Sequence, residues 1–310
     1  MKICFIGIGS IAKRHISNLK EIAEEHGFAL LVDAVRRSNS WDLDIGIDTV
    51  YHSTDDLPGN YDAIFITNPT DFHLDTLFEV NGKASNFFIE KPVTSVRKLQ
   101  QAENLCIRED NLYYVACPLR YTNVIQYLKT FVKENRVIGV RCISSSYLPE
   151  WRPGIDYRDT YSSHKELGGG VSIDLIHEWD YLKYLFGMPT DVIYKSGKKS
   201  NLELNCEDTA LYIAEYADKF VELHLDYFGR KTIREVMLFT EDDTVVGDLV
   251  SGKITFMKSG KVINFGDHRN DFQKRELIHF LELMKIGDSD NSIQDAINTM
   301  KLTQGWAGDR

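Results

Sequence analysis

The stretch that decides the fold is Lys2–Ala12, KICFIGIGSIA, at the N-terminus. Its apolar half predicts a buried β-strand, which a glycine-rich turn and the start of a helix follow directly. In a dinucleotide-binding turn the first glycine, here Gly7, permits a tight bend, and the second, Gly9, lets the backbone approach a pyrophosphate. Ala12 then allows the helix to pack closely on the strand. We expect this stretch to bind a dinucleotide; the alternative is a glycine-rich turn that binds nothing.

The same alternation of strands and helices continues through residues 1–118. Strands are expected at KICFIG, ALLVDAV, DTVYHS, DAIFIT, NFFIE and LYYVAC, with helices such as Ile11–Glu25 and Leu74–Val80 between them. Strands that alternate with helices indicate βαβ units and a parallel sheet covered on both faces. We therefore predict an α/β Rossmann domain with a doubly wound parallel sheet over residues 1–118.

A second pattern begins at residue 119. A helix, VIQYLKTFVKEN, and a strand, VIGVRCISSSYL, precede three glycines and an apolar helix at Val171–Phe186. Strand-like runs then follow without helices between them: DVIYKSG, TALYIAEYA, FVELHLDYF, REVMLFT, DTVVGDL and GKITFMK. They predict an open, meander-like antiparallel sheet. We expect a second α/β domain over residues 119–310, whose closing helices, near Phe272–Lys285 and Ser292–Gln304, could pack back on the first domain.

Composition excludes several classes of protein. The 310 residues carry 36 Lys and Arg against 46 Asp and Glu, a net charge of −10, which argues against a nonspecific nucleic-acid binder and against adhesion to anionic membranes. No apolar run approaches the roughly 20 residues that span a bilayer. The five cysteines are scattered and form no C-x-x-C pair. We therefore expect a reduced, cytoplasmic protein without a metal site.

The end of the second strand, Val35–Ser38, bears on the choice of cofactor. An NAD site usually has a carboxylate here for the ribose hydroxyls, whereas Arg36, Arg37 and Ser38 suit a 2′-phosphate. Asp33 lies inside the apolar strand rather than at its tip. The pattern favours NADP, with NAD as the second choice; in the alternative interpretation the two arginines are solvated loop residues.

Two further loops end neighbouring strands of the predicted sheet. TNPTDFH, residues 67–73, follows the fourth strand, and EKP, residues 90–92, follows the fifth. Ligands of open parallel sheets bind at the carboxyl ends of strands, so both loops are expected beside the cofactor, although each alone is also an ordinary turn. Lys91 would bring positive charge to a developing alkoxide. The predicted cofactor contacts are Gly7, Gly9, Ser10, Ile11, Ala12, Arg36, Arg37, Ser38, Thr67, Asn68, Pro69, His73, Glu90 and Lys91.

The three glycines at residues 168–170 open the apolar helix, on which Asp174 and His177 are spaced i and i+3 and share one face. A histidine beside a carboxylate is suited to moving a proton near neutral pH. The alternative is a capped helix whose Asp and His make structural hydrogen bonds. The H-E-x-x-H pattern of a zinc protease is absent, because position 181 is Tyr.

The polar and aromatic segment Tyr147–Arg158 precedes this helix. Aromatic rings such as Trp151 and Tyr157 can stack on sugar or base faces, and Arg152 and Arg158 can pair with a carboxylate or a phosphate. We expect a polyhydroxylated substrate with an acidic group, such as a nucleotide sugar or a sugar acid. The alternative is a loop that packs on a neighbouring subunit.

Taken in order, GIGSIA, TNPTDFH, EKP and GGG-x-x-x-D-x-x-H resemble the Gfo/Idh/MocA family of sugar and cyclitol oxidoreductases over nearly the whole chain. The resemblance implies a Rossmann domain joined to an α/β domain with an open, mostly antiparallel sheet, which often forms the interface of a homodimer or homotetramer. It implies that Lys91, His177 and Asp174 surround the carbon that exchanges hydride. His177 would be the general acid/base, Asp174 would orient substrate or His177, and Lys91 would stabilise the alkoxide. Arg120 matches a position at the entrance to the second domain, where it would make a structural contact or one to cofactor or substrate.

The chain departs from the family pattern in two places. The helix Asp and His are three residues apart where many members have four, and one residue on a helix is a rotation of about 100°. On a continuous helix only one of the two keeps the usual direction, so we trust His177 more than Asp174. A subgroup of the family has a similar D-x-x-H-E-x-D-Y arrangement. The chain also has TNP where TPN is commoner.

These patterns predict a dehydrogenase or reductase that transfers hydride between a nicotinamide cofactor and a sugar-type substrate. Two alternatives stay open: a redox-neutral glycosidase or lyase of the same fold that retains NAD, and a non-catalytic NAD(P)-binding sensor. The presence of Lys91, Asp174 and His177 argues against the sensor.

Overall fold

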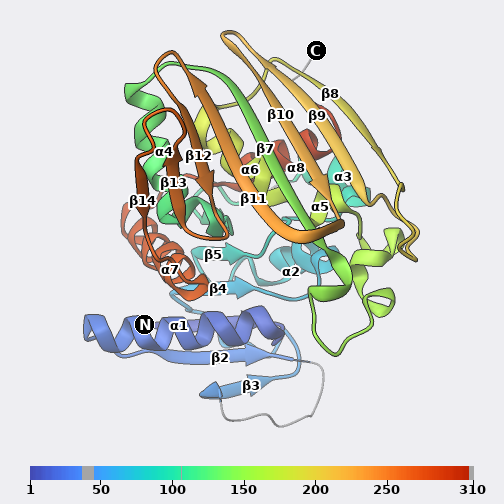
Figure 1. Ribbon diagram of the computed structural model, residues 1–310. Helices are drawn as coiled ribbons and strands as arrows, with labels where there is room; N and C mark the ends of the chain where they lie inside the picture. Colours follow the sequence, from blue (N-terminus) through green and yellow to red (C-terminus); the bar gives the residue numbers. More distant parts are fainter. Residues whose placement is uncertain (37–44, 106, 307–310) are drawn as a thin grey trace. The chain divides into compact units, whose positions relative to one another are not determined.

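The computed structural model describes residues 1–36, 45–105 and 107–306 (Figure 1). The chain forms two compact units. Unit 1 consists of Met1–Pro118 together with Arg269–Ile297, and unit 2 consists of Leu119–His268 together with the residues from Asn298 onward. In the described part of the chain, no helix is long and apolar enough to cross a membrane.

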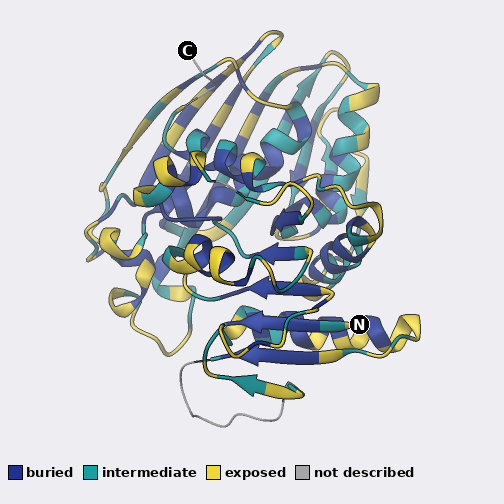
Figure 2. Cartoon of the chain, turned by 180° about the vertical axis from the view of Figure 1, so that it is seen from behind, coloured by how far each residue is buried: buried dark blue, intermediate teal, exposed yellow. Residues whose placement is uncertain are grey.

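Unit 1 contains a six-stranded parallel sheet in the order β3-β2-β1-β4-β5-β6. The predicted doubly wound parallel sheet is confirmed, and its apolar strands are almost wholly buried (Figure 2) because helices cover both faces. After β3, at one edge of the sheet, the chain crosses back to β4 beside β1, so the strand order reverses between β1 and β4. The strands are β1 (Lys2–Ile6), β2 (Leu31–Val35), β3 (Thr49–Tyr51), β4 (Ala63–Ile66), β5 (Asn86–Ile89) and β6 (Leu112–Val115).

The helices of unit 1 include one from the far end of the chain. They are α1 (Ser10–His26), α2 (His73–Val80), α3 (Leu99–Glu103) and α7 (Arg269–Ile286). Helix α7 packs on α1, and its Phe280 meets the rings of Phe65 and Phe88 edge-on, with centroids 5.6 and 5.3 Å apart. Beyond α7, the side-chain amide of Asn291 donates to the carbonyl of Val115 at 2.7 Å. The C-terminal segment therefore completes the core of unit 1 and covers the β6 edge of its sheet.

Unit 2 contains an eight-stranded sheet in the order β14-β13-β12-β11-β7-β10-β9-β8. All pairs are antiparallel except β7 with β10, so the expectation of a mostly antiparallel sheet is confirmed. The strands are β7 (Val137–Tyr147), β8 (Asp191–Gly197), β9 (Thr209–Tyr216), β10 (Lys219–Asp226), β11 (Phe228–Thr240), β12 (Thr244–Asp248), β13 (Lys253–Phe256) and β14 (Val262–Asn264).

The expectation of a simple meander is wrong, because β7 separates β10 from β11. Only Tyr227 joins these two strands, which is too short for the two-residue turn of a hairpin between neighbours. The carboxylate of Asp226 instead accepts hydrogen bonds from Ser145 at the end of β7 and from the backbone N–H groups of Phe228 and Gly229. These contacts turn the chain across the end of β7, so that β11 pairs with it.

The expectation of one helix over Val171–Phe186 is also wrong. The structure has two helices, α5 (Val171–Asp174) and α6 (Ile176–Phe186), separated by Leu175 with φ −97° and ψ 33°. The break lies between two buried acidic residues, Asp174 and Glu178, and each binds a different partner. Asp174 accepts a hydrogen bond from Tyr227, and Glu178 pairs with Arg234 of β11. The remaining helices are α4 (Asn123–Glu134), which packs on α6, and α8 (Ile293–Thr303) at the end of the chain.

Candidate functional site

The glycine-rich turn after β1 lies against the loop after β4. Gly7 has φ +90°, and a Cβ on it would lie 2.7 Å from Cα of Asn68. The hydroxyl of Thr67 donates to the carbonyl oxygen of Gly7 at 2.7 Å. Two loops from either side of the strand-order reversal therefore meet backbone to backbone, which only a residue without a side chain permits at this position.

The start of α1 fits a diphosphate. Gly9 is the N-cap and supplies no side-chain hydrogen bond, and the first turn, which is described throughout, contains no acidic residue. A Cβ on Gly9 would meet nothing within 4 Å of the described structure, and Ser10 beside it is exposed. The first-turn N–H groups thus face open space at the positive end of a 17-residue helix, which favours an anion. Ala12 is fully buried, as close helix packing requires.

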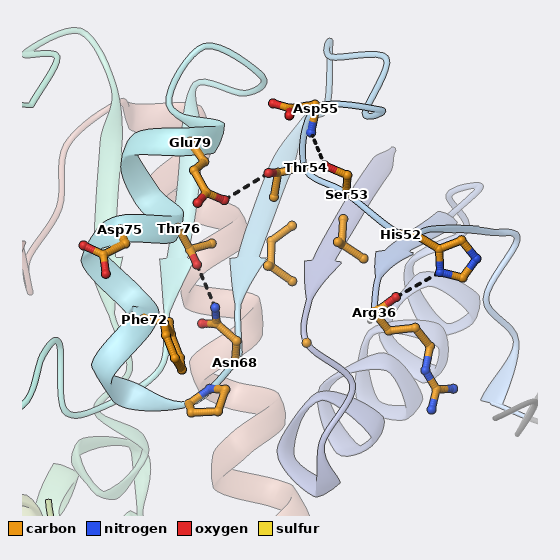
Figure 3. A pocket seen from close by; sticks show the side chains of 14 residues that line it. Arg36, His52, Ser53, Thr54, Asp55, Asn68, Phe72, Asp75, Thr76 and Glu79 are labelled. Atoms are coloured by element: carbon orange, nitrogen blue, oxygen red, sulfur yellow. Dashed lines mark hydrogen bonds between the residues drawn. The ribbon is translucent and has the colours of Figure 1, made fainter. Parts of the chain in front are cut away.

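A cavity of about 680 Å³ adjoins this turn within unit 1 (Figure 3). Asn68 and Pro69 form part of its wall, and Arg36 lies at the tip of β2 on another side. The amide nitrogen of Asn68 donates to Thr76 at 2.7 Å, while its Oδ1 is buried without a hydrogen-bond partner among the described residues. The lining residues are Ile6, Gly7, Val35, Arg36, His52, Ser53, Thr54, Asp55, Asn68, Pro69, Phe72, Asp75, Thr76 and Glu79. The size and the polar lining suit part of a dinucleotide.

The segment after β3 also lines this cavity, and its residues are not among the cofactor contacts predicted from the sequence. His52 follows β3, and its Nδ1 lies 3.2 Å from the carbonyl oxygen of Arg36. Thr54 donates to the carboxylate of Glu79 on α2 at 3.0 Å. The rule that ligands bind at the carboxyl ends of parallel strands, applied to β3 as it was to β2, β4 and β5, would have pointed to these residues.

Asp33 is the one carboxylate within β2, and it lies in the middle of the strand rather than at its tip. It is buried, accepts a hydrogen bond from the Tyr61 hydroxyl at 2.8 Å and pairs with Lys2 at 3.3 Å. Arg36 is the charged residue that follows the strand and lines the cavity. Arg37 and Ser38, also predicted to contact the cofactor, lie outside the described residues.

His73, predicted as a cofactor contact, instead joins two loops. The side chain is buried, and burial lowers the pKa of the imidazole. Its Nδ1 lies 3.0 Å from the carbonyl oxygen of Pro92 and its Nε2 lies 2.9 Å from that of Asn68. Both ring nitrogens therefore contact the backbone, and the residue holds the loop after β4 against the loop after β5 rather than pointing at a ligand.

Glu90 is likewise turned into the protein. Its Oε1 lies 2.7 Å from Nε2 of the buried His15 on α1, and its Oε2 accepts a hydrogen bond from the backbone N–H of Lys91 at 3.2 Å. Burial opposes ionisation, but the hydrogen bond with His15 and the positive charge of Lys91 outweigh it, so the pKa of Glu90 lies below its ordinary value. Glu90 fixes the start of the loop that carries Lys91, which is itself half-buried and joined to Pro92 by a cis peptide.

The predicted catalytic residues of unit 2 lie on either side of the helix break. Asp174 ends α5 and is buried, and its Oδ2 accepts a hydrogen bond from the Tyr227 hydroxyl at 2.6 Å. Burial and the charge of Asp174 raise the pKa of Tyr227, which keeps this hydroxyl protonated. His177 lies in the first turn of α6 and is half-buried. Because Leu175 interrupts the helix, the two residues do not share a face of one regular helix, and a fixed rotation per residue does not relate their directions.

Arg120 has a buried carboxylate partner. Its Nε and Nη2 donate to the two carboxylate oxygens of Asp180 at 2.9 and 2.7 Å, and its guanidinium lies 5.1 Å from the centre of the Tyr184 ring. A buried bidentate pair of this kind is costly to break, because either partner alone would leave an uncompensated charge. Of a structural contact and a contact to cofactor or substrate, this geometry favours the structural contact for Arg120.

The predicted substrate segment is already engaged in internal contacts. Trp151 donates from its indole to Ser146 at 2.9 Å, and Arg152 lies 5.0 Å from the centre of the Tyr161 ring. Arg158 donates to Asp156 and to Glu203, so the carboxylates beside it neutralise its charge. Tyr157 accepts a hydrogen bond from the backbone N–H of Glu203 at 2.9 Å. Carboxylates of unit 2 therefore neutralise Arg158, whereas the contact of Arg152 is with an aromatic ring and leaves its charge in place.

The chain matches two sequence profiles. Residues 1–117 match the Gfo/Idh/MocA profile described as an oxidoreductase family with an NAD-binding Rossmann fold. Residues 153–231 match the profile of the C-terminal alpha/beta domain of the same family.

Similar proteins include named dehydrogenases. The uncharacterized oxidoreductase YrbE of Bacillus subtilis is 27% identical over 66% of this chain, and the chain spans 61% of the length of that relative. The scyllo-inositol 2-dehydrogenase (NAD(+)) of Bacillus subtilis is 25% identical, and the matched region covers 99% of this chain and 92% of the length of that relative. The structure of levoglucosan dehydrogenase with NADH and levoglucosan matches with a TM-score of 0.85 at 13% identity, covering 98% and 95% of the two chains. This last likeness shows that the two proteins share a fold.

Proposed function

Because the chain belongs to the Gfo/Idh/MocA oxidoreductase family, we propose that it transfers hydride between a nicotinamide cofactor and a carbinol or keto carbon of a sugar, nucleotide sugar, sugar acid or cyclitol. The observation that carries the proposal is the contact of Gly7 with Asn68 beside the open start of α1 and the 680 Å³ cavity. The scyllo-inositol and levoglucosan dehydrogenases named above support the substrate class.

The residues take the following roles in the proposal. When bound, the nicotinamide supplies or accepts the hydride. Lys91 stabilises the negative charge that develops on the substrate oxygen, and His177 takes or gives the proton of that oxygen. Asp174, which the Tyr227 hydroxyl holds in place, orients the substrate or His177. In this division residues 1–118 bind the cofactor and residues 119–310 supply the substrate side.

NADP is the cofactor that we propose first, and Arg36 is the residue that tests it. Arg36→Ala should raise the Kd for NADPH by about 10–100-fold, because a charge-assisted contact to the 2′-phosphate is lost, and should leave the Kd for NADH nearly unchanged. Fluorescence titration of both reduced cofactors measures the two constants. Arg108→Ala, an exposed arginine of unit 1 outside the cavity, is the control. Tighter binding of NADH than of NADPH by the unchanged protein would refute the preference.

Absorbance of the reduced nicotinamide tests the reaction itself. The protein is incubated with NAD(H) or NADP(H) and with inositols, aldoses, sugar acids and nucleotide sugars in turn. Net change in the reduced cofactor supports the dehydrogenase. Product formation without net change would favour the redox-neutral glycosidase or lyase, and cofactor binding without product from any substrate would favour the sensor.

We also propose that the exposed face of the unit 2 sheet joins copies of this chain. Ile193 and Ile213 are direct partners on β8 and β9, and both are exposed, at 64% and 47%; Leu211 and Phe220 extend the same apolar surface. A surface of this kind on a sheet marks an interface. Ile213→Asp should weaken association by about 100-fold, because it buries an unpaired charge. Light scattering after size exclusion measures the mass, with Ile286→Asp, an exposed residue of α7, as the control. A monomeric unchanged protein would contradict the proposal.

A further inference from the structure

Unit 2 has a cavity of its own, of about 440 Å³. Its lining includes residues from the end of β7 and the start of β11, two strands that pair with each other (Figure 1). Tyr147 and Phe228 are direct partners across these strand ends, and both line the cavity. Tyr157 lines it too and is held by the N–H of Glu203. Three aromatic side chains from separate segments thus line the cavity, and aromatic rings are the groups on which a planar ring stacks. They are called the aromatic wall below.

Two cations line the same cavity, Lys199 and Arg230. The guanidinium of Arg230 lies 3.8 Å from the centre of the Tyr147 ring, so the charge is held over the aromatic wall. Across residues 1–36, 45–105 and 107–306 neither side chain has a carboxylate partner, in contrast to Arg158 nearby, which has two. In a chain of net charge −10, two cations left without carboxylates beside one cavity favour an anionic ligand.

Two buried carboxylates hold the backbone segments that carry, or directly precede, the two cations. Asp208 accepts hydrogen bonds from the backbone N–H groups of Lys199 and Ser200 at 2.7 and 2.8 Å. Asp226 accepts those of Phe228 and Gly229 at 3.0 and 2.8 Å. Because these two carboxylates bind the backbone, they shape the loops without neutralising the cations above them.

We propose that this cavity binds a nucleoside phosphate, with the base on the aromatic wall and the phosphate between Lys199 and Arg230. Its volume suits a small ligand. The bound nucleoside phosphate could be a free nucleotide or the nucleotide end of a nucleotide-sugar substrate. The nucleotide-sugar substrate rests on the proposed function, whereas the binding of a nucleoside phosphate does not.

Calorimetric titration with UDP and GDP tests the binding. NADH and NADPH are both present at saturation, because nucleotides also suit the cavity of unit 1. The unchanged protein should bind at least one of the two nucleotides, and uridine or guanosine about tenfold or more weakly, because the charge-assisted contacts are missing. Lys199→Gln and Arg230→Gln should each weaken nucleotide binding by about tenfold. Lys231→Gln, the same change one residue further along β11 and outside the cavity, should leave it unchanged.

The proposal fails if neither nucleotide binds, or if Lys199→Gln and Arg230→Gln bind nucleotide as the unchanged protein does. Unchanged melting temperatures of the two variants show that a loss of binding is not a loss of folding. Phe228→Leu provides a further check, because it removes one ring from the cavity lining and leaves the contact of Arg230 with Tyr147 in place. It should weaken UDP or GDP but not inorganic phosphate. Equal weakening of both would contradict the stacking of the base.

Steady-state kinetics then distinguish the two sources. If the nucleotide is part of the substrate, Arg230→Gln raises KM for UDP-glucose about tenfold and leaves KM for glucose or inositol unchanged. If only free UDP binds, no nucleotide sugar is oxidised and UDP changes the rate with another substrate. Nucleotide binding without hydride transfer to any substrate would refute the proposed function alone, whereas hydride transfer without nucleotide binding would refute this inference alone.

Discussion

Lys91→Met should lower kcat for hydride transfer by about 10²–10³-fold, the usual cost of removing one group that stabilises a developing oxyanion. Methionine keeps an unbranched side chain of nearly the same length and removes the charge, so the backbone of the loop after β5 should remain as Glu90 and His73 hold it. The Kd for the cofactor should change only a few-fold, since most of its predicted contacts are elsewhere in unit 1. Stopped-flow measurement of hydride transfer with a good substrate gives kcat, and fluorescence titration gives Kd.

The control for Lys91→Met is Lys231→Met, the same change at an exposed position of unit 2. It should keep full activity. If turnover is unchanged in both Lys91→Met and His177→Asn, the catalytic roles assigned to these two residues are wrong, whatever the cofactor titration shows.

Gly7→Ala should lower the free energy of unfolding by about 1–3 kcal/mol and abolish measurable cofactor binding. The new Cβ would lie 2.7 Å from Cα and 2.9 Å from N of Asn68, and φ +90° is strained for any residue with a side chain. The loops after β1 and β4 must then separate. Thermal unfolding measures the loss of stability, and titration with NADH and NADPH measures binding.

Gly9→Ala is the matched comparison, because the same added methyl meets nothing within 4 Å. It should leave the stability of the free protein within about 1 kcal/mol of the original, since Gly and Ala differ by about that much at a helix start. Cofactor affinity should nevertheless fall, because the methyl occupies the space proposed for the pyrophosphate. Unchanged affinity in Gly9→Ala would contradict the placement of the phosphates.

The strands and the cofactor turn could be predicted from the sequence because their signals are local. KICFIGIGSIA carries in eleven residues both the apolar run of a buried strand and the glycines of its turn. All six predicted strands of unit 1 form, each within two residues of the predicted limits.

The remaining features could not be predicted, because they depend on partners distant in the sequence. The sequence predicts one apolar helix over Val171–Phe186, and nothing local marks the break at Leu175. The acidic residues on either side of the break bind Tyr227 and Arg234, which lie some 50 residues further on. Arg158 suggested an anion site by residue type alone, and only the fold shows that Glu203 neutralises it. In the same way, Arg230 gave no signal in the sequence, because the aromatic ring beneath it comes from the end of another strand.

The position of α7 in unit 1 has a consequence for the order in which the chain matures. As the chain leaves the ribosome, residues 1–118 emerge well before Phe280 and Asn291, which finish their core and cover β6 and which are made about 160 and 170 residues later. Throughout that interval the apolar surface that α7 covers, and the open edge of the sheet, stay exposed to solvent and to other chains. The glycine-rich turn after β1 is therefore made long before the helix that completes the core around it.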